Sequence, residues 1–123
     1  MARETPQRKA IRRAIEEAPG PVAPNEVHEA AKREIARLGV ATVYRTLRDM
    51  SEAGEIKAVE LPGEPARYEL AHLEHHHHFR CRKCQRVFDI EGCPGSLQSL
   101  VPEGFTLEDH DIVLRGLCAH CQD

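Results

Sequence analysis

The chain has 123 residues, of which 41% are hydrophobic and 30% are charged, and its formal net charge is −3. This composition is typical of a folded protein and excludes a disordered or fibrous chain, and the length allows one compact unit or two very small ones. The polar start, MARETPQRKAIRR, and the lack of a long apolar run exclude a signal peptide and a membrane span, so we expect a cytoplasmic protein.

The charge is distributed unevenly along the chain. Residues 1–58 carry 11 Lys and Arg against 9 Asp and Glu, a balance of +2. Residues 59–123 carry 6 Lys and Arg against 11 Asp and Glu, a balance of −5. The first half is therefore the better candidate for contact with phosphates.

Apolar spacing in the first half predicts three helices, over residues 5–18, 24–39 and 41–54. Thr5 is the predicted N-cap of the first helix, with Pro6 at its first helical position. Gly39 and Gly54 are the predicted ends of the second and third helices. The third helix carries its apolar side chains on one face: Val43, Leu47 and Met50.

The pattern changes after Gly54, where IKAVEL and the alternating residues of ARYEL flank the turn sequence PGEP. This arrangement predicts a β-hairpin. Three helices followed by a hairpin is the order of a winged helix, in which the last helix enters the major groove of DNA. A solvated charged face would explain the third helix alone, but its position before a hairpin favours contact with DNA. The candidate DNA-contacting residues are Thr42, Tyr44, Arg45, Arg48 and Arg3.

The composition shifts to His and Cys from His72 onward, which places a boundary near residues 68–72. We therefore expect a DNA-binding domain over residues 1–68 and a metal-binding domain over residues 72–123. In the second domain HHFRCRKCQRVFDI predicts a hairpin that turns at the first CxxC, and residues 92–101 predict a short helix or irregular turn. The sequence FTLEDHDIVLRGLC predicts two further strands.

Four of the five cysteines form two CxxC pairs, Cys81/Cys84 and Cys118/Cys121, with 33 residues between the pairs. Each pair can hold a tetrahedral metal from one tight turn, whereas buried thiols or a redox pair are the less favoured explanations. Four thiolates leave no open coordination position, so the spacing predicts a structural zinc site without catalysis. Cys93 is left over, and an incidental thiol is favoured over an extra ligand or an oxidisable thiol.

A run of histidines forms a second candidate site, flanked by Glu69 and Asp89. Its members are His72, His75, His76, His77 and His78. In a strand, His76 and His78 face one side and the residues next to them face the other, so one run can supply two metal sites. Mixed imidazole and carboxylate ligands suit zinc, ferrous iron or manganese, and a solvated polar strand is the plainer alternative. His28 is interpreted as a partly buried or surface histidine.

Taken together, ATVYRTL, HHHHFRCRKCQRVFDI and HDIVLRGLCAHC resemble the ferric uptake regulator family over essentially the whole chain. The resemblance implies an α+β fold, with a winged helix followed by a small α/β dimerisation domain that has an antiparallel sheet. It also implies a homodimer that binds palindromic DNA operators in response to a metal. The regulatory site would comprise Glu69, His76, His78 and Asp89, and a further site His75, His77 and His110. The four paired cysteines match the family's structural zinc site, and Tyr44 and Arg45 its recognition helix.

The sequence departs from the family pattern at three positions. Pro21 stands where many members have a histidine that joins the DNA-binding domain to the regulatory metal, and His72 is the candidate replacement. Ser96 stands near the carboxylate expected for the further site, which weakens the prediction of that site. Glu69 stands where peroxide-sensing members of the family have Asp, which disfavours a peroxide sensor.

Two other functional classes are less consistent with the sequence. A zinc hydrolase needs an open metal position and a general base, and no HExxH or equivalent motif occurs. A zinc storage or chaperone module would explain the histidines and leave the winged-helix pattern without a purpose. We therefore predict a non-enzymatic, metal-responsive repressor with structural zinc and a second divalent metal, which is zinc, manganese or ferrous iron. It would have neither a membrane partner nor a small-molecule substrate, and a peroxide-sensing or redox-sensing regulator on the same fold is the near alternative.

Overall fold

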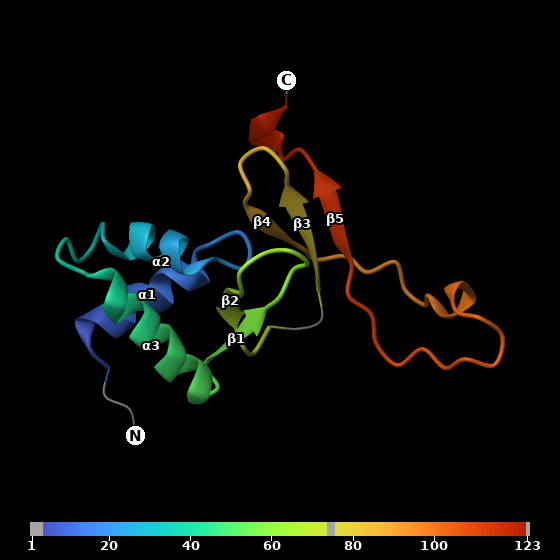
Figure 1. Cartoon of the computed structure of the whole chain (residues 1–123), viewed down its shortest axis with the longest axis horizontal. Coiled ribbons are helices and arrows are strands. Elements are labelled where there is room, and N and C mark those ends of the chain that lie inside the picture. Colours follow the sequence, from blue (N-terminus) through green and yellow to red (C-terminus); the bar gives the residue numbers. More distant parts are fainter. Residues whose placement is uncertain (1–3, 74–75, 123) are drawn as a thin grey trace. The chain divides into compact units, whose positions relative to one another are not determined.

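The computed structural model describes residues 4–73 and 76–122. The chain divides into two compact units, with the boundary between residues 73 and 74. The first unit contains three helices and a two-stranded sheet, and the second contains a three-stranded sheet (Figure 1). None of the helices in the described part of the chain is long and apolar enough to cross a membrane.

Helix α1 (Pro6–Glu16) begins at the predicted N-cap. The side chain of Thr5 accepts a hydrogen bond of 3.1 Å from the backbone N–H of Arg8, and Pro6 occupies a position where no backbone donor is needed. The helix ends two residues earlier than predicted. Its inner face packs in the core of the unit through Ala10, Ile11 and Ile15.

Helix α2 (Pro24–Ala31) is much shorter than the predicted helix over residues 24–39. Residues 32–38 form turns instead, and Leu38 reaches the core, where it is 5% exposed. The carbonyl oxygen of Leu38 lies 2.8 Å from Nε2 of His28, which ties the turn back onto α2. A helix that continued to Gly39 would be about 12 Å longer and would carry Leu38 away from this core.

Helix α3 (Val40–Glu52) begins immediately after this turn, and Gly39 is its N-cap. The prediction that Gly39 ends the second helix is therefore wrong. The predicted apolar face is confirmed, because Val43, Leu47 and Met50 are each at most 1% exposed. Gly54 has φ +78°, a left-handed conformation that glycine adopts without strain and that directs the chain into the next strand.

Strands β1 (Ile56–Val59) and β2 (Arg67–Leu70) form the predicted antiparallel hairpin. Tyr68 and Leu70 pack against the helical core, as their alternation predicts. The opposite face of β2 is also buried. Arg67 on this face is 7% exposed, and its Nη1 lies 2.6 Å from Oε1 of Glu26 on α2. Three helices and a hairpin in this order form a winged helix.

The second unit has strand order β4–β3–β5, from β3 (His77–Cys81), β4 (Val87–Ile90) and β5 (Val113–Gly116). The β3–β4 pair is the predicted antiparallel hairpin, whereas β5 runs parallel to β3. Residues 105–118 supply one strand, so the prediction of two is wrong. A parallel partner must be reached by a long connection, and residues 105–112 are part of that connection.

The connection from β4 to β5, residues 91–112, extends away from the sheet and carries a short 3-10 helix, η1 (Gln98–Leu100) (Figure 1). After β5 the chain forms a second 3-10 turn, η2 (Ala119–Cys121). This turn lies at the same end of the sheet as the turn between β3 and β4. Both CxxC pairs are therefore brought to one end of the unit.

Candidate metal centres

Four cysteine sulfurs converge at that end of the second unit. Cys81 ends β3, Cys84 lies in the turn that follows, and the other two cysteines flank and end η2. One ligand atom from each of Cys81, Cys84, Cys118 and Cys121 lies within 4.8 Å of the others. A zinc–sulfur bond of about 2.3 Å in a tetrahedron requires sulfurs about 3.8 Å apart. The Sγ atoms of Cys84 and Cys118 are 3.9 Å apart, so the four residues fit a zinc ion.

The electrostatics of this cluster also favour a bound cation. The pKa of Cys81 is lowered to about 5 because the backbone amides of Cys118 and Cys84 donate to its sulfur. The pKa of Cys121 is raised to about 12, chiefly through the hydrogen bond between its thiol and the sulfur of Cys118. These hydrogen bonds favour a thiolate at Cys81 and a protonated thiol at Cys121, and all four thiols can lose their protons only beside a compensating positive charge. A divalent metal supplies that charge.

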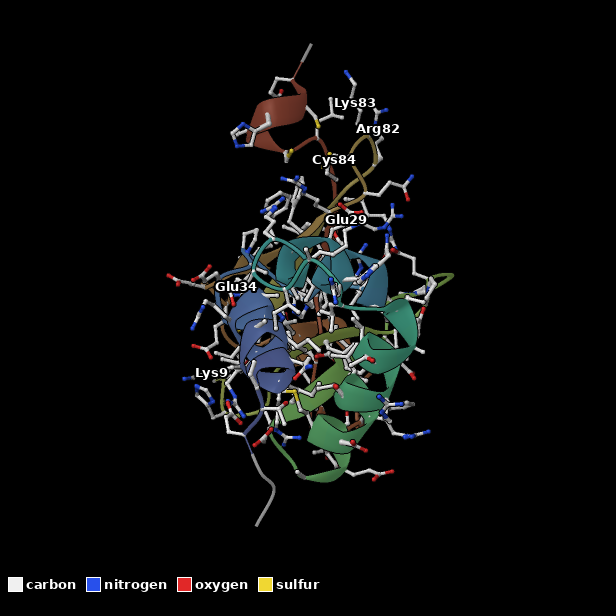
Figure 2. All side chains as sticks on the ribbon, turned by 90° about the vertical axis from the view of Figure 1, so that its left-hand side faces the viewer. Lys9, Glu29, Glu34, Arg82, Lys83 and Cys84 are labelled. Atoms are coloured by element: carbon white, nitrogen blue, oxygen red, sulfur yellow. The ribbon has the colours of Figure 1, made fainter. Side chains whose placement is uncertain are left out.

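The local backbone explains how Cys84 is presented. Gln85 has φ +67°, and its N–H donates to the carbonyl of Cys81 at 2.9 Å, which closes the turn. The backbone N–H of Cys84 points at Sγ of Cys81, 3.5 Å away. Figure 2 shows Arg82 and Lys83 beside Cys84, so two positively charged residues belong to the turn that presents this cysteine.

A second cluster forms where β3 faces β4. His78 is directly opposite Asp89 in the strand register. Oδ1 of Asp89 lies 3.3 Å from Nε2 of His76 and 3.7 Å from Nε2 of His78. The two imidazole rings meet edge to face, with centroids 4.8 Å apart. Three nitrogen and oxygen donors thus converge in a group separate from the thiol cluster.

The other residues predicted for the regulatory site belong to the first unit. Glu69 on β2 is 4% exposed, and its Oε1 lies 3.6 Å from Nζ of Lys57 on β1. His72 is exposed in the turn after β2. Pro21 is buried and has no side-chain donor, although its carbonyl oxygen lies 3.4 Å from Nη1 of Arg67. His28 has the structural role described above, at the turn after α2.

A third cluster lies on the opposite side of β3, where strand alternation predicted a second site. His77, which is 2% exposed, and His110 are brought together, and their stacked rings have centroids 5.0 Å apart. Their third neighbour is Cys93, for which the sequence favoured an incidental thiol. The third predicted member, His75, lies outside the described residues. Sequence spacing carries no signal for Cys93, because its position depends on the path of the connection after β4.

The candidate DNA-contacting residues of α3 lie away from its buried face. Tyr44 is 57% exposed, Arg45 and Arg48 are exposed, and Thr42 is half-buried. Nη2 of Arg45 lies 3.4 Å from Oγ1 of Thr42, so the guanidinium lies along the helix surface. Arg3 lies outside the described residues.

A winged-helix unit and a unit rich in clustered cysteine and histidine, joined in one chain, are the combination expected of a metal-binding regulator. The model of the ferric uptake regulator family matches residues 1–115 of the chain. A ferric uptake regulation protein from Bordetella parapertussis is 35% identical over 102 residues, which cover 79% of this chain and 72% of the relative. The chain therefore belongs to the ferric uptake regulator family.

Solved structures agree with this assignment. A zinc-bound manganese uptake regulator matches with a TM-score of 0.84 and 30% identity, over 95% of this chain and 91% of that one. A ferric uptake regulator from Francisella tularensis with iron matches with a TM-score of 0.73 and 30% identity, over 99% of this chain and 96% of that one. Because these relatives hold different metals, the shared fold does not by itself select the metal.

Proposed function

We propose that the protein is a transcriptional repressor that binds a palindromic DNA operator as a homodimer when a divalent metal occupies a regulatory site. The observation that carries this proposal is the convergence of His76, His78 and Asp89. This cluster is open to a labile metal, whereas the four-cysteine cluster is closed and structural. A chain with both kinds of site can keep its fold while responding to a second metal.

The regulatory ligands are His76, His78 and Asp89, with Glu69 added on the family resemblance. A tetrahedral metal with nitrogen and oxygen ligands requires these donors to be about 3.4 Å apart, and the two separations from Asp89 are 3.3 and 3.7 Å. When bound, the cation supplies the positive charge that neutralises the carboxylates. Zinc, manganese and ferrous iron are all compatible with this ligand set. His72 is a further candidate ligand.

The DNA-binding surface is the exposed side of α3. Guanidinium groups of Arg45 and Arg48 can pair with guanine edges or phosphates, and Tyr44 can contact a phosphate or a thymine methyl group. These side chains are supported from behind by the buried face of the helix, which holds α3 rigidly on the core. Rigid support favours specific recognition, because less side-chain and backbone entropy is lost on binding.

The homodimer is supported by apolar surface on the second unit. Leu100 and Phe105 on the connection between β4 and β5 are 76% and 64% exposed, and Leu114 on the edge strand β5 is 51% exposed. Exposed apolar side chains and an unpaired strand edge are features that a protein–protein interface covers. A two-fold dimer would present two copies of α3 to the two halves of a palindrome.

The proposal is tested by measuring operator binding by fluorescence anisotropy, before and after mild chelation that spares the four-cysteine zinc. We expect chelation to abolish specific binding and the addition of zinc, manganese or ferrous iron to restore it. Asp89→Asn should lose this metal dependence, whereas the matched control Asp111→Asn, at an exposed position, should keep it. DNA binding that is indifferent to chelation would refute the proposed regulation.

A further inference from the structure

Three side chains that can bind a metal meet where the two ends of the connection between β4 and β5 come together. His77 begins β3, Cys93 follows the end of β4, and His110 precedes β5. One donor atom from each lies within 4.8 Å of the other two. The connection that leaves the sheet in Figure 1 therefore has one donor near each of its ends, and both meet a third donor on the central strand.

The distances within this group match a metal site. Sγ of Cys93 lies 3.4 Å from Nε2 of His77 and 3.3 Å from Nε2 of His110. A tetrahedral zinc ion with one sulfur and one nitrogen ligand requires a separation of about 3.6 Å between these atoms. A shift of a few tenths of an ångström would admit the ion. His77 is buried and holds its position, whereas Cys93 is exposed and accessible to solvent.

The family resemblance implies a further metal site that includes His77 and His110. We propose that Cys93 is the third protein ligand of this site in this chain, supplying a thiolate in place of the missing carboxylate, and that the site is therefore a zinc site. A thiolate is a soft ligand that selects zinc over manganese and over ferrous iron. The site therefore differs in metal preference from the cluster of His76, His78 and Asp89. Three protein ligands leave one coordination position to solvent, so this zinc is more exchangeable than the ion held by four cysteines.

The hydrogen bonds of His77 show which protons zinc must displace. The backbone N–H of Ile112 donates to Nδ1 of His77 at 3.1 Å, so the proton of the neutral ring is on Nε2 and points at Sγ of Cys93. Zinc binding through Nε2 releases one proton from the Cys93 thiol and requires the ring proton to transfer to Nδ1. The amide of Ile112 then needs another acceptor. Metal binding is thereby coupled to the backbone just before β5.

Zinc at this site would join the two ends of the connection between β4 and β5. The ion would link residues 93 and 110 across the intervening segment, which carries the exposed Leu100 and Phe105. Closing a loop in this way reduces its conformational freedom. If the proposed homodimer uses this segment, zinc bound by His77, Cys93 and His110 would also favour the dimer. That consequence alone rests on the proposed function.

The test uses the full chain with zinc retained at the four-cysteine site and with His76→Ala and His78→Ala removing the regulatory cluster. Cobalt added to this variant should give a thiolate-to-cobalt charge-transfer band, and zinc should displace it. Adding Cys93→Ser should abolish the band and remove one equivalent of bound zinc. His110→Ala should weaken zinc binding by at least about tenfold, because loss of a direct ligand costs no less than loss of a group that only supports one. Ser99→Ala, at an exposed position of the same connection, is the matched control and should change neither the band nor the zinc content.

Two further measurements keep the outcome interpretable. Cys93→His should retain the zinc equivalent and lose the charge-transfer band, because it replaces one ligand type with another. In the variant that carries only His76→Ala and His78→Ala, zinc should slow the alkylation of Cys93. Equal zinc content with and without Cys93, or alkylation indifferent to zinc, would overturn the proposal. Reversible oxidation of Cys93 by peroxide without zinc binding would also overturn it, and would assign the thiol to redox chemistry.

Discussion

Removing the structural zinc should unfold the second unit and leave the first unit folded. The two units differ sharply in their buried apolar side chains. Residues 4–73 include eleven buried hydrophobic residues, from Ala10 to Leu61, whereas residues 76–122 include two, Cys81 and Val87. Because Cys81 is itself a proposed zinc ligand, one of these two residues belongs both to the metal site and to the small apolar core. The perturbation is a strong chelator, or Cys121→Ser in the intact chain.

The magnitude follows from comparing the two sources of stability. Full burial of Val87 contributes about 1.5–3 kcal/mol, and half-buried Phe79, Phe88 and Ile90 contribute less than full burial would. Binding of a structural zinc ion contributes about 10–16 kcal/mol in small zinc-dependent folds. Zinc therefore stabilises the second unit more than its apolar core does, and the loss is as large as the roughly 5–15 kcal/mol by which whole domains are stable.

Hydrogen exchange measured by mass spectrometry separates the two units in one experiment. After zinc removal, peptides from residues 76–122 should exchange at rates close to those of an unfolded chain, whereas peptides from α1 and α3 should keep their protection. Asp111→Asn is a suitable control, because it changes an exposed residue of the same unit outside the thiol cluster. Retained protection in β3 and β5 after complete zinc removal would show that the second unit does not depend on the metal for its fold.

Three further predictions concern single groups. In the metal-free cluster, folding lowers the pKa of Cys81 from 9.0 to about 5, so the stability that its thiolate contributes is complete above the ordinary pKa and is lost as pH falls through about 5. Acid should therefore destabilise residues 76–122 in the metal-free chain, which circular dichroism would measure, and protons should compete with zinc for the same thiolates, which a zinc indicator would detect. Arg45→Ala should weaken operator binding by about 1–3 kcal/mol without changing dimerisation, whereas Lys83→Ala should not, and unchanged affinity would contradict the assigned role. His28→Ala should lower the unfolding free energy of the first unit by about 1–3 kcal/mol in urea, because the carbonyl of Leu38 loses its partner.

Features with local causes were predictable from the sequence. Thr5 and Pro6 define the start of α1 by capping chemistry, and the spacing of Val43, Leu47 and Met50 defines the buried face of α3. The CxxC pairs are equally local, because each pair places two sulfurs within one turn. The order of these features along the chain also sufficed for the family resemblance, which the comparisons confirm together with the fold class.

Features that depend on distant residues were decided by the tertiary structure. The end of α2 could not be predicted, because Val27, Ala31 and Leu38 have spacings that fit a continuous helix as well as a helix followed by a turn. The core decides between them, since the turn buries Leu38 in the same unit. Similarly, FTLEDHDIVLRGLC contains one strand because its partner β3 requires a parallel approach.

The metal clusters were also predictable only in part from the sequence. Alternation in the strand separates His76 and His78 from His77, and the sequence therefore predicted that one run could supply two sites. The sequence could not predict that Cys93 would lie between His77 and His110, because the connection that carries Cys93 has no periodic pattern. Only the register of β4 and β5 against β3 brings these three side chains together, since each comes from a different part of the chain.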